Sequence, residues 1–150
     1  MDRKKGLKIL IATSIIAIVL FSYLLSAHYS DKESTFCNFG EGLNCDIVNK
    51  SIYSELFGIP VALFGILTFL LVLCLSILSW KDYNSEMFGL KINSESMMNT
   101  IFWASIAGVL FALYLVYIEA FVLYSFCILC FGGDILIIIT LATSYSLTRK

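Results

Sequence analysis

The stretch that decides the fold reads LFGIPVALFGILTFLLVLCLSILS from Leu56 to Ser79, and it holds no charged side chain. Glu55 directly precedes it, and Lys81 follows it after one residue. A helix of about 20 apolar residues crosses the hydrocarbon layer of a membrane, whereas a charge at mid-bilayer is costly. The stretch also lacks the alternation of apolar and polar residues that marks a strand of a membrane barrel. It therefore predicts a transmembrane helix.

Three further apolar runs divide the rest of the chain. They extend over residues 9–27, 97–118 and 126–147. Because only helices and closed barrels satisfy their backbone groups in lipid, these runs also predict transmembrane helices. We therefore expect an all-α fold, a polytopic four-helix bundle that forms a single domain over residues 1–150.

The composition of the chain excludes other classes of protein. Of its 150 residues, 59% are hydrophobic and 14% are charged, against roughly 45–50% and about 25% in soluble domains. A soluble fold of this size would expose large apolar patches, and disordered chains are far more polar. The net charge is −1, and the basic residues are dispersed over the ends and loops. A nucleic-acid partner is not expected, because binding phosphates requires a basic surface.

The distribution of basic residues predicts the orientation, because Lys and Arg near the ends of spans remain in the cytoplasm. The residues on the cytoplasmic side would be Arg3, Lys4, Lys5, Lys8, Lys81, Lys91, Arg149 and Lys150, against Lys32 and Lys50 on the other side. We expect both termini in the cytoplasm, with residues 28–55 and a short turn at 119–125 on the extracytoplasmic face of the plasma membrane. The first run is longer than the apolar part of a secretory signal and lacks a good cleavage site, so it is expected to be a span.

The unusual chemistry of this chain lies in its five cysteines. Residues 127–130 read CILC, a C-x-x-C pair at the outer start of the fourth run. The N-terminus of a helix stabilises a thiolate, which would make one of the two cysteines a nucleophile and a good leaving group. Two buried apolar thiols are the alternative, because free cysteine is among the most buried residue types. The motif alone leaves both interpretations open.

A second pair, Cys37 and Cys45, lies in residues 28–55, which we call the outer segment. Two glycines and two asparagines stand between them, a link that can fold back on itself and allow a disulfide. A structural bridge is the alternative, although so short a loop restricts the unfolded chain only modestly. The predicted orientation puts both pairs on the oxidising side of the membrane, where one pair can exchange with the other. Cys74, deep in the second run, is expected to be a packing residue.

Four local patterns occur together in this chain. They are Cys37-x7-Cys45, Ser51 six residues later, FGIPVALFG over residues 57–65, and FVLYSFCILC over residues 121–130. With these patterns the chain resembles the short, prokaryotic-type members of the vitamin K epoxide reductase family. The resemblance extends over all four predicted helices and their order.

The resemblance implies a four-helix bundle around a quinone of the menaquinone or ubiquinone type. Electrons would come from a thioredoxin-like, DsbA-type partner protein, so that disulfides are made outside the cytoplasm. Cys37 would meet the partner, Cys45 would attack Cys127, and Cys130 would be the thiolate next to the quinone ring. Reduction of vitamin K quinone or its epoxide is an alternative activity. A non-enzymatic bundle with structural disulfides or a bound soft metal is an alternative of another class.

Two further positions near the quinone are suggested, each with an alternative. Ser51 matches a hydroxyl residue of the family near the active site, but it could instead cap a helix. Asp134 lies one helical turn inward of Cys130 and could donate a proton or a hydrogen bond to the reduced quinone, or be a structural carboxyl. The chain departs from the animal enzymes twice. Ser54-Glu55 stands where they have asparagine, and Asp134 stands where they have tyrosine.

The remaining features predict packing. Ala104, Gly108 and Ala112 form a stripe of small residues on which a neighbouring helix can lie closely. Aromatic residues of the spans, namely Phe64, Phe111 and Tyr114, could line a quinone pocket but are more often simple packing residues. No metal site is expected, because His28 is the single histidine and has no acidic residues at ligand spacing.

Overall fold

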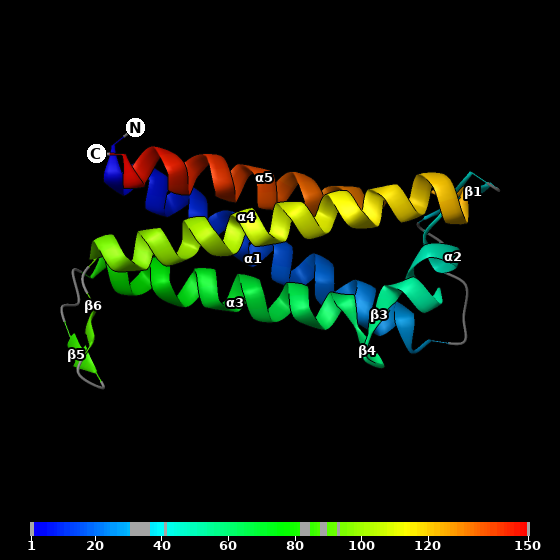
Figure 1. Cartoon of the computed structure of the whole chain (residues 1–150), viewed down its shortest axis with the longest axis horizontal. Helices are drawn as coiled ribbons and strands as arrows, with labels where there is room; N and C mark the ends of the chain where they lie inside the picture. The colour runs from blue at the N-terminus through cyan, green and yellow to red at the C-terminus, as the bar shows by residue number, and fades with distance from the viewer. Residues whose placement is uncertain are drawn as a thin grey trace.

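Four long helices lying side by side make up most of the molecule (Figure 1). The computed structural model describes residues 2–30, 37–40, 42–81, 85–87, 90–92 and 94–149. The long helices are α1 (Arg3–His28), α3 (Val61–Trp80), α4 (Ser94–Ile118) and α5 (Ile128–Thr148). Each is long and apolar enough to cross a membrane. The expected all-α, four-helix membrane fold is therefore confirmed.

Each long helix contacts two others: α1 packs against α3 and α5, and α4 packs against α5 and α3. Both termini lie at one end of the bundle, as an even number of spans requires (Figure 1). The core at that end is formed by Leu7, Leu10, Val72, Met97, Met98 and Ile101. The outward faces of the helices carry exposed residues such as Val19 and Leu110. In a membrane protein these faces are covered by lipid, so their exposure carries no penalty.

The second span begins later than predicted. Leu56 to Pro60 belong to a hairpin instead of a helix, formed by strands β3 (Glu55–Leu56) and β4 (Ile59–Pro60). Phe57 and Gly58 turn the chain with positive φ angles of 55° and 78°, the backbone of a tight primed hairpin turn. Pro60 has no N–H and disfavours helical backbone in the residue before it, so α3 starts only after it.

The outer segment folds over the end of the bundle opposite the termini (Figure 1). It contains β1 (Asn38–Gly40), β2 (Leu43–Asn44), α2 (Cys45–Asn49) and the short helix η1 (Ile52–Ser54). A hairpin of β5 (Ser85–Met87) and β6 (Leu90–Ile92) lies at the other end. Lys32 and Lys150, which contribute to the predicted orientation, lie outside the described residues.

Asn49 and His28 fasten the outer segment to α1. The buried Asn49 donates from Nδ2 to the Leu24 carbonyl at 2.8 Å, and its own carbonyl accepts from His28 Nδ1 at 2.6 Å. His28 Nε2 lies 3.1 Å from the Glu55 carboxylate. These contacts join the outer segment to the end of α1.

Three glycines allow close contacts between the long helices. A Cβ on Gly108 would lie 3.0 Å from Ile137 of α5, which confirms the close approach predicted for the small-residue stripe at this position. A Cβ on Gly65 or on Gly133 would lie 2.9 or 2.8 Å from the Phe21 ring. The ring of Phe21 therefore occupies space that glycines of α3 and α5 leave open.

Candidate active site

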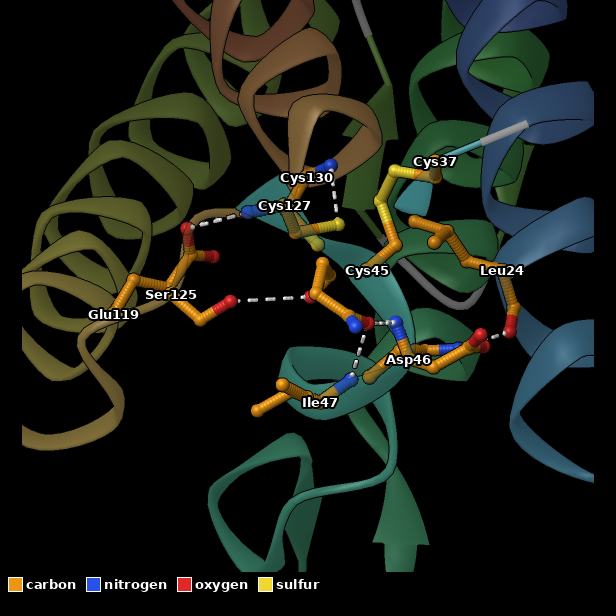
Figure 2. The surroundings of a disulfide bond; sticks show 11 residues. Leu24, Cys37, Cys45, Asp46, Ile47, Glu119, Ser125, Cys127 and Cys130 are labelled. Carbon is orange, nitrogen blue, oxygen red and sulfur yellow. Dashed lines mark hydrogen bonds between the residues drawn. A yellow bond between two sulfur atoms is a disulfide. The ribbon is translucent and has the colours of Figure 1, made fainter. Parts of the chain in front are cut away.

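A disulfide joins Cys37 and Cys45 at the outer end of the bundle (Figure 2). Both residues are buried, and their Cα atoms are 5.5 Å apart. Cys45 is the first residue of α2, whose start is set by Asn44. The Asn44 Oδ1 atom accepts hydrogen bonds from the N–H groups of Asp46 and Ile47 at 3.0 and 3.1 Å, the arrangement of a helix cap.

The second cysteine pair forms the start of α5. Cys127 is the N-cap residue, and its Sγ accepts a hydrogen bond from the Cys130 N–H at 3.1 Å (Figure 2). The sulfur thus takes the place of the oxygen that caps many helices. Cys127 is fully buried, Cys130 is half-buried, and both are free thiols.

The two cysteine pairs are far apart in the sequence, and they meet because the outer segment packs against the loop before α5. Leu43 and Phe126 form a parallel bridge, in which Asn44 N–H donates to the Phe126 carbonyl at 3.2 Å and Phe126 N–H to the Gly42 carbonyl at 3.0 Å. As a result the Sγ atoms of Cys37, Cys45 and Cys127 lie within 4.8 Å of one another. Two of these sulfurs are joined, so this state offers a single free thiol there, not a set of metal ligands.

The outcome for Cys74 differs from the expectation. It is exposed on the outward face of α3, while Phe69, Val72 and Ser76 occupy the face turned to the other helices. The expected packing role within the protein is therefore wrong, because the helix turns this position toward the lipid.

A cavity of about 160 Å³ lies between the helices beneath the cysteine pairs. This volume is close to that of an engineered apolar cavity that binds benzene. Its aromatic walls come from Phe21, Tyr53, Phe64, Phe69 and Phe111. Phe64 and Phe111 thus face the cavity, whereas Tyr114 does not line it and is 49% exposed. The cavity can take up an aromatic or quinonoid ring.

Cys130, Ser51 and Asp134 all line this cavity. The Ser51 hydroxyl donates to the Val48 carbonyl at 2.8 Å and forms no cap bond, although Ser51 precedes η1. The alternative in which its side chain caps the start of the segment leading into the second span is therefore wrong. Asp134 is half-buried in the cavity wall, one turn of α5 beyond Cys130. The structure thus brings together the three residues that the sequence suggested near a quinone.

Sequence reasoning missed Glu119, which it treated as the boundary of the third span. Instead of a turn, residues Glu119–Leu123 form a π-helical extension of α4, labelled η2. The Glu119 side chain is only 4% exposed, lines the cavity and accepts a hydrogen bond at Oε2 from the Cys127 N–H at 3.1 Å (Figure 2). The available signal was a lone carboxylate among apolar residues, eight positions before Cys127.

Comparison with known proteins agrees with this arrangement. A family model described as the vitamin K epoxide reductase family matches residues 8–145. The matched region contains the outer segment, both cysteine pairs and nearly the whole of the four long helices.

Proposed function

The chain belongs to the vitamin K epoxide reductase family, whose members are quinone-linked membrane redox enzymes, and from this premise we propose a specific activity. The protein is a thiol–disulfide oxidoreductase of the cytoplasmic membrane. It passes electrons from a reduced thioredoxin-like, DsbA-type partner through its two cysteine pairs to a membrane quinone. The product is a disulfide in the partner, on the extracytoplasmic side.

The observation that carries this proposal is the cluster of three sulfur atoms within 4.8 Å of one another. Disulfide exchange requires a thiolate to approach one sulfur of a disulfide closely. A partner thiolate would attack Cys37 and release Cys45, and the second partner thiol would then attack the mixed disulfide, which releases Cys37 and forms the partner's disulfide. Cys45 would attack Cys127 and release Cys130, after which Cys37 closes on Cys45. Two electrons and two protons have then moved from the partner to Cys127 and Cys130.

The state of the cysteines fits one stage of this cycle. Cys37 and Cys45 are joined, while Cys127 and Cys130 are free. This is the stage at which Cys127 and Cys130, the inner pair, have received electrons and await a quinone. Since Cys130 lines the cavity and Cys127 lies next to the outer disulfide, Cys130 is the thiol that would meet the quinone ring.

The direction of electron flow follows from redox potentials. A quinone pool is a strong enough oxidant to regenerate even an oxidising thioredoxin-like protein. The cavity supports a quinone as the acceptor, because its walls are largely aromatic and apolar and it has the volume of a single ring. We expect this acceptor to be a quinone of the menaquinone or ubiquinone type, because such a substrate dissolves in the membrane.

One of the two departures from the animal enzymes argues against epoxide reduction in their manner. Where those have asparagine, this chain has Ser54-Glu55. The Ser54 hydroxyl donates to the carbonyls of Asn49 and Ser51, and Glu55 contacts His28. Neither side chain supplies an amide to the cavity. We therefore place thiol oxidation ahead of epoxide reduction.

The proposal is tested with the purified chain in lipid vesicles that contain a quinone. Reduced thioredoxin-like protein is added, and quinone loss is followed by its ultraviolet absorbance. We expect quinone reduction that depends on the protein, is abolished in Cys130→Ala and is unchanged in the matched control Cys74→Ala. If quinone is reduced neither with the thioredoxin-like protein nor with a small dithiol, the proposal is contradicted. Turnover of added vitamin K epoxide at a comparable rate would favour the alternative enzyme.

A further inference from the structure

The proposed cycle leaves one prominent group without a role, the carboxylate of Glu119. Among the acidic side chains that the structure describes, it is the most deeply buried. It lies in a helix long and apolar enough to span a membrane. A carboxylate in such a place is expensive and is a candidate functional group for that reason.

The local backbone is built around this residue. The Glu119 carbonyl accepts the N–H groups of both Tyr124 and Ser125, the latter at 3.2 Å, which closes the π-helical turn. Tyr124 itself has a positive φ of 50°. Single π-helical turns are rare and occur often at functional sites. Here the turn holds the Glu119 side chain over the cavity and against the backbone of Cys127.

Within the described part of the chain, none of the ion pairs, such as Lys5–Asp2, His28–Glu55 and Lys50–Asp46, involves this carboxylate. Its recorded side-chain partner is the Cys127 N–H. A structural carboxylate in an apolar region would normally have a cation beside it. This one stands instead beside a thiol pair.

The chemistry at this cavity moves protons as well as electrons. Oxidation of two thiols by a quinone transfers two of each, and the apolar walls offer few groups that can hold a proton. The groups facing the cavity that can do so are Tyr53 of η1, Glu119 of η2, and Cys130 and Asp134 of α5. Of the two carboxyl groups, Glu119 is the more buried and is the one bonded to the backbone of a reacting cysteine.

We infer that Glu119 carries a proton between the inner thiol pair and the quinone, an inference that rests on the proposed function. One thiol proton moves to the Glu119 carboxylate, so that Cys130 reacts as a thiolate. When Cys127 and Cys130 close their disulfide, two electrons pass to the quinone. One quinone oxygen takes the proton of the Cys127 thiol and the other takes the proton of Glu119. The products are a quinol, a disulfide and a Glu119 carboxylate ready for the next cycle.

A role in positioning Cys127 is the rival explanation, and the side-chain chemistry separates the two. A glutamine at position 119 has nearly the same size and can still accept the Cys127 N–H through its amide oxygen, but it cannot carry the proton. An alanine loses both functions. An aspartate keeps the carboxyl group on a shorter stem. Glu95, an exposed acid at the opposite end of α4, provides the control Glu95→Gln.

The experiment mixes each pre-reduced variant rapidly with a short-chain ubiquinone analogue and records a single turnover. Glu119→Gln should slow quinone reduction about 100-fold, the lower end of the range for a positioned acid–base group. Glu119→Asp should recover part of that loss, and Glu95→Gln should match the parent chain. Exchange between the reduced partner and the Cys37–Cys45 disulfide should be unchanged in all variants. A Glu119→Gln variant as fast as the parent chain, with Glu119→Ala slow, would overturn the inference and leave a positioning role.

A second measurement does not depend on quinone turnover or on the proposed function. Infrared difference spectra are recorded as a small dithiol reduces the inner cysteine pair. We expect a change in the carboxylic-acid C=O band that is absent in Glu119→Gln and present in Glu95→Gln. Thermal unfolding shows which variants are folded. If Glu119→Gln is not folded, Glu119→Asp replaces it in the infrared measurement, where the shorter side chain should shift the band. If the parent chain does not reduce quinone, the proposed function is wrong, but the infrared band still tests the inference about Glu119. A parent spectrum without the band overturns that inference.

Discussion

Cys127 combines two tasks in one side chain. Its Sγ caps α5 by accepting the Cys130 N–H, and it lies within 4.8 Å of the sulfurs of Cys37 and Cys45. A hydroxyl could perform the first task but not the second. The residue is fully buried between the outer segment and the helix, which explains how both pairs can be close without being open to solvent.

The two tasks predict different results for two substitutions. Cys127→Ser should keep the cap, whereas Cys127→Ala should lower the free energy of unfolding by about 1 kcal/mol. Both should stop oxidation of the thioredoxin-like protein by quinone, since both lack the sulfur. Thermal or denaturant unfolding in detergent measures the first effect and quinone loss the second. Equal stability of the two variants would show that the sulfur contributes nothing as a cap.

The positions of the two free thiols also predict their separate roles. Removing Cys130 leaves Cys127 beside the outer pair, so Cys130→Ala should accumulate a disulfide between Cys45 and Cys127. Removing Cys127 leaves Cys130 in the cavity wall, so Cys127→Ala should show a long-wavelength charge-transfer absorption when quinone is added. Peptide mapping without reduction and visible absorption spectra measure these outcomes. If the charge-transfer absorption appears only in Cys130→Ala, Cys127 is the thiol that meets the quinone and the two roles must be exchanged.

At the scale of the elements, helix packing shapes the cavity. Phe21 of α1 stacks on Phe69 of α3, with ring centroids 5.9 Å apart, and both rings line the cavity. The Phe21 ring reaches this position because Gly65 and Gly133 leave room for it. The packing of three helices thus converges on one wall of the candidate quinone site.

Gly133→Ala is therefore expected to disturb the cavity. The new Cβ would lie 2.8 Å from Phe21 Cζ, so the ring must move. We expect a loss of about 1–3 kcal/mol in the free energy of unfolding, typical of overpacking, and a raised KM for quinone. Adding Phe21→Leu provides the space again and should restore part of the stability. A double variant that is no better than Gly133→Ala would show that the ring is not the obstacle.

At the scale of the whole molecule, the two ends of the bundle differ. One end carries both termini, and the other carries the outer segment and all four site cysteines (Figure 1, Figure 2). Because basic residues gather near the termini, we expect the cysteine end to face away from the cytoplasm. That side is also the one where disulfides persist.

This orientation predicts which positions can be labelled in intact cells. In a Cys74→Ala background, cysteine is introduced at Ile52, which is 82% exposed in the outer segment, or at Lys81, which is exposed at the opposite end. A membrane-impermeant thiol reagent added outside should label position 52 and leave position 81 unmodified until the cells are opened. Labelling of position 81 alone would reverse the orientation and place the cysteine pairs in a reducing compartment.

Much of this architecture follows from the sequence by itself. Four long runs without central charges determined the number, type and order of the helices, because lipid excludes both charge and unpaired backbone. The spaced Cys37 and Cys45, together with the C-x-x-C pair, identified the residues able to do redox chemistry. These properties are local, so they can be read from neighbouring residues.

Only the tertiary structure decided how these parts meet. The bridge from Leu43 to Phe126, the Phe21 ring between two glycines, and the burial of Glu119 all depend on contacts between segments far apart in the chain. A lone acid such as Glu119 has the same sequence signature at the end of a span as in the wall of a cavity. What distinguishes the two places is the packing of α4 against α5 and of η2 against α2, which is a property of the folded chain alone.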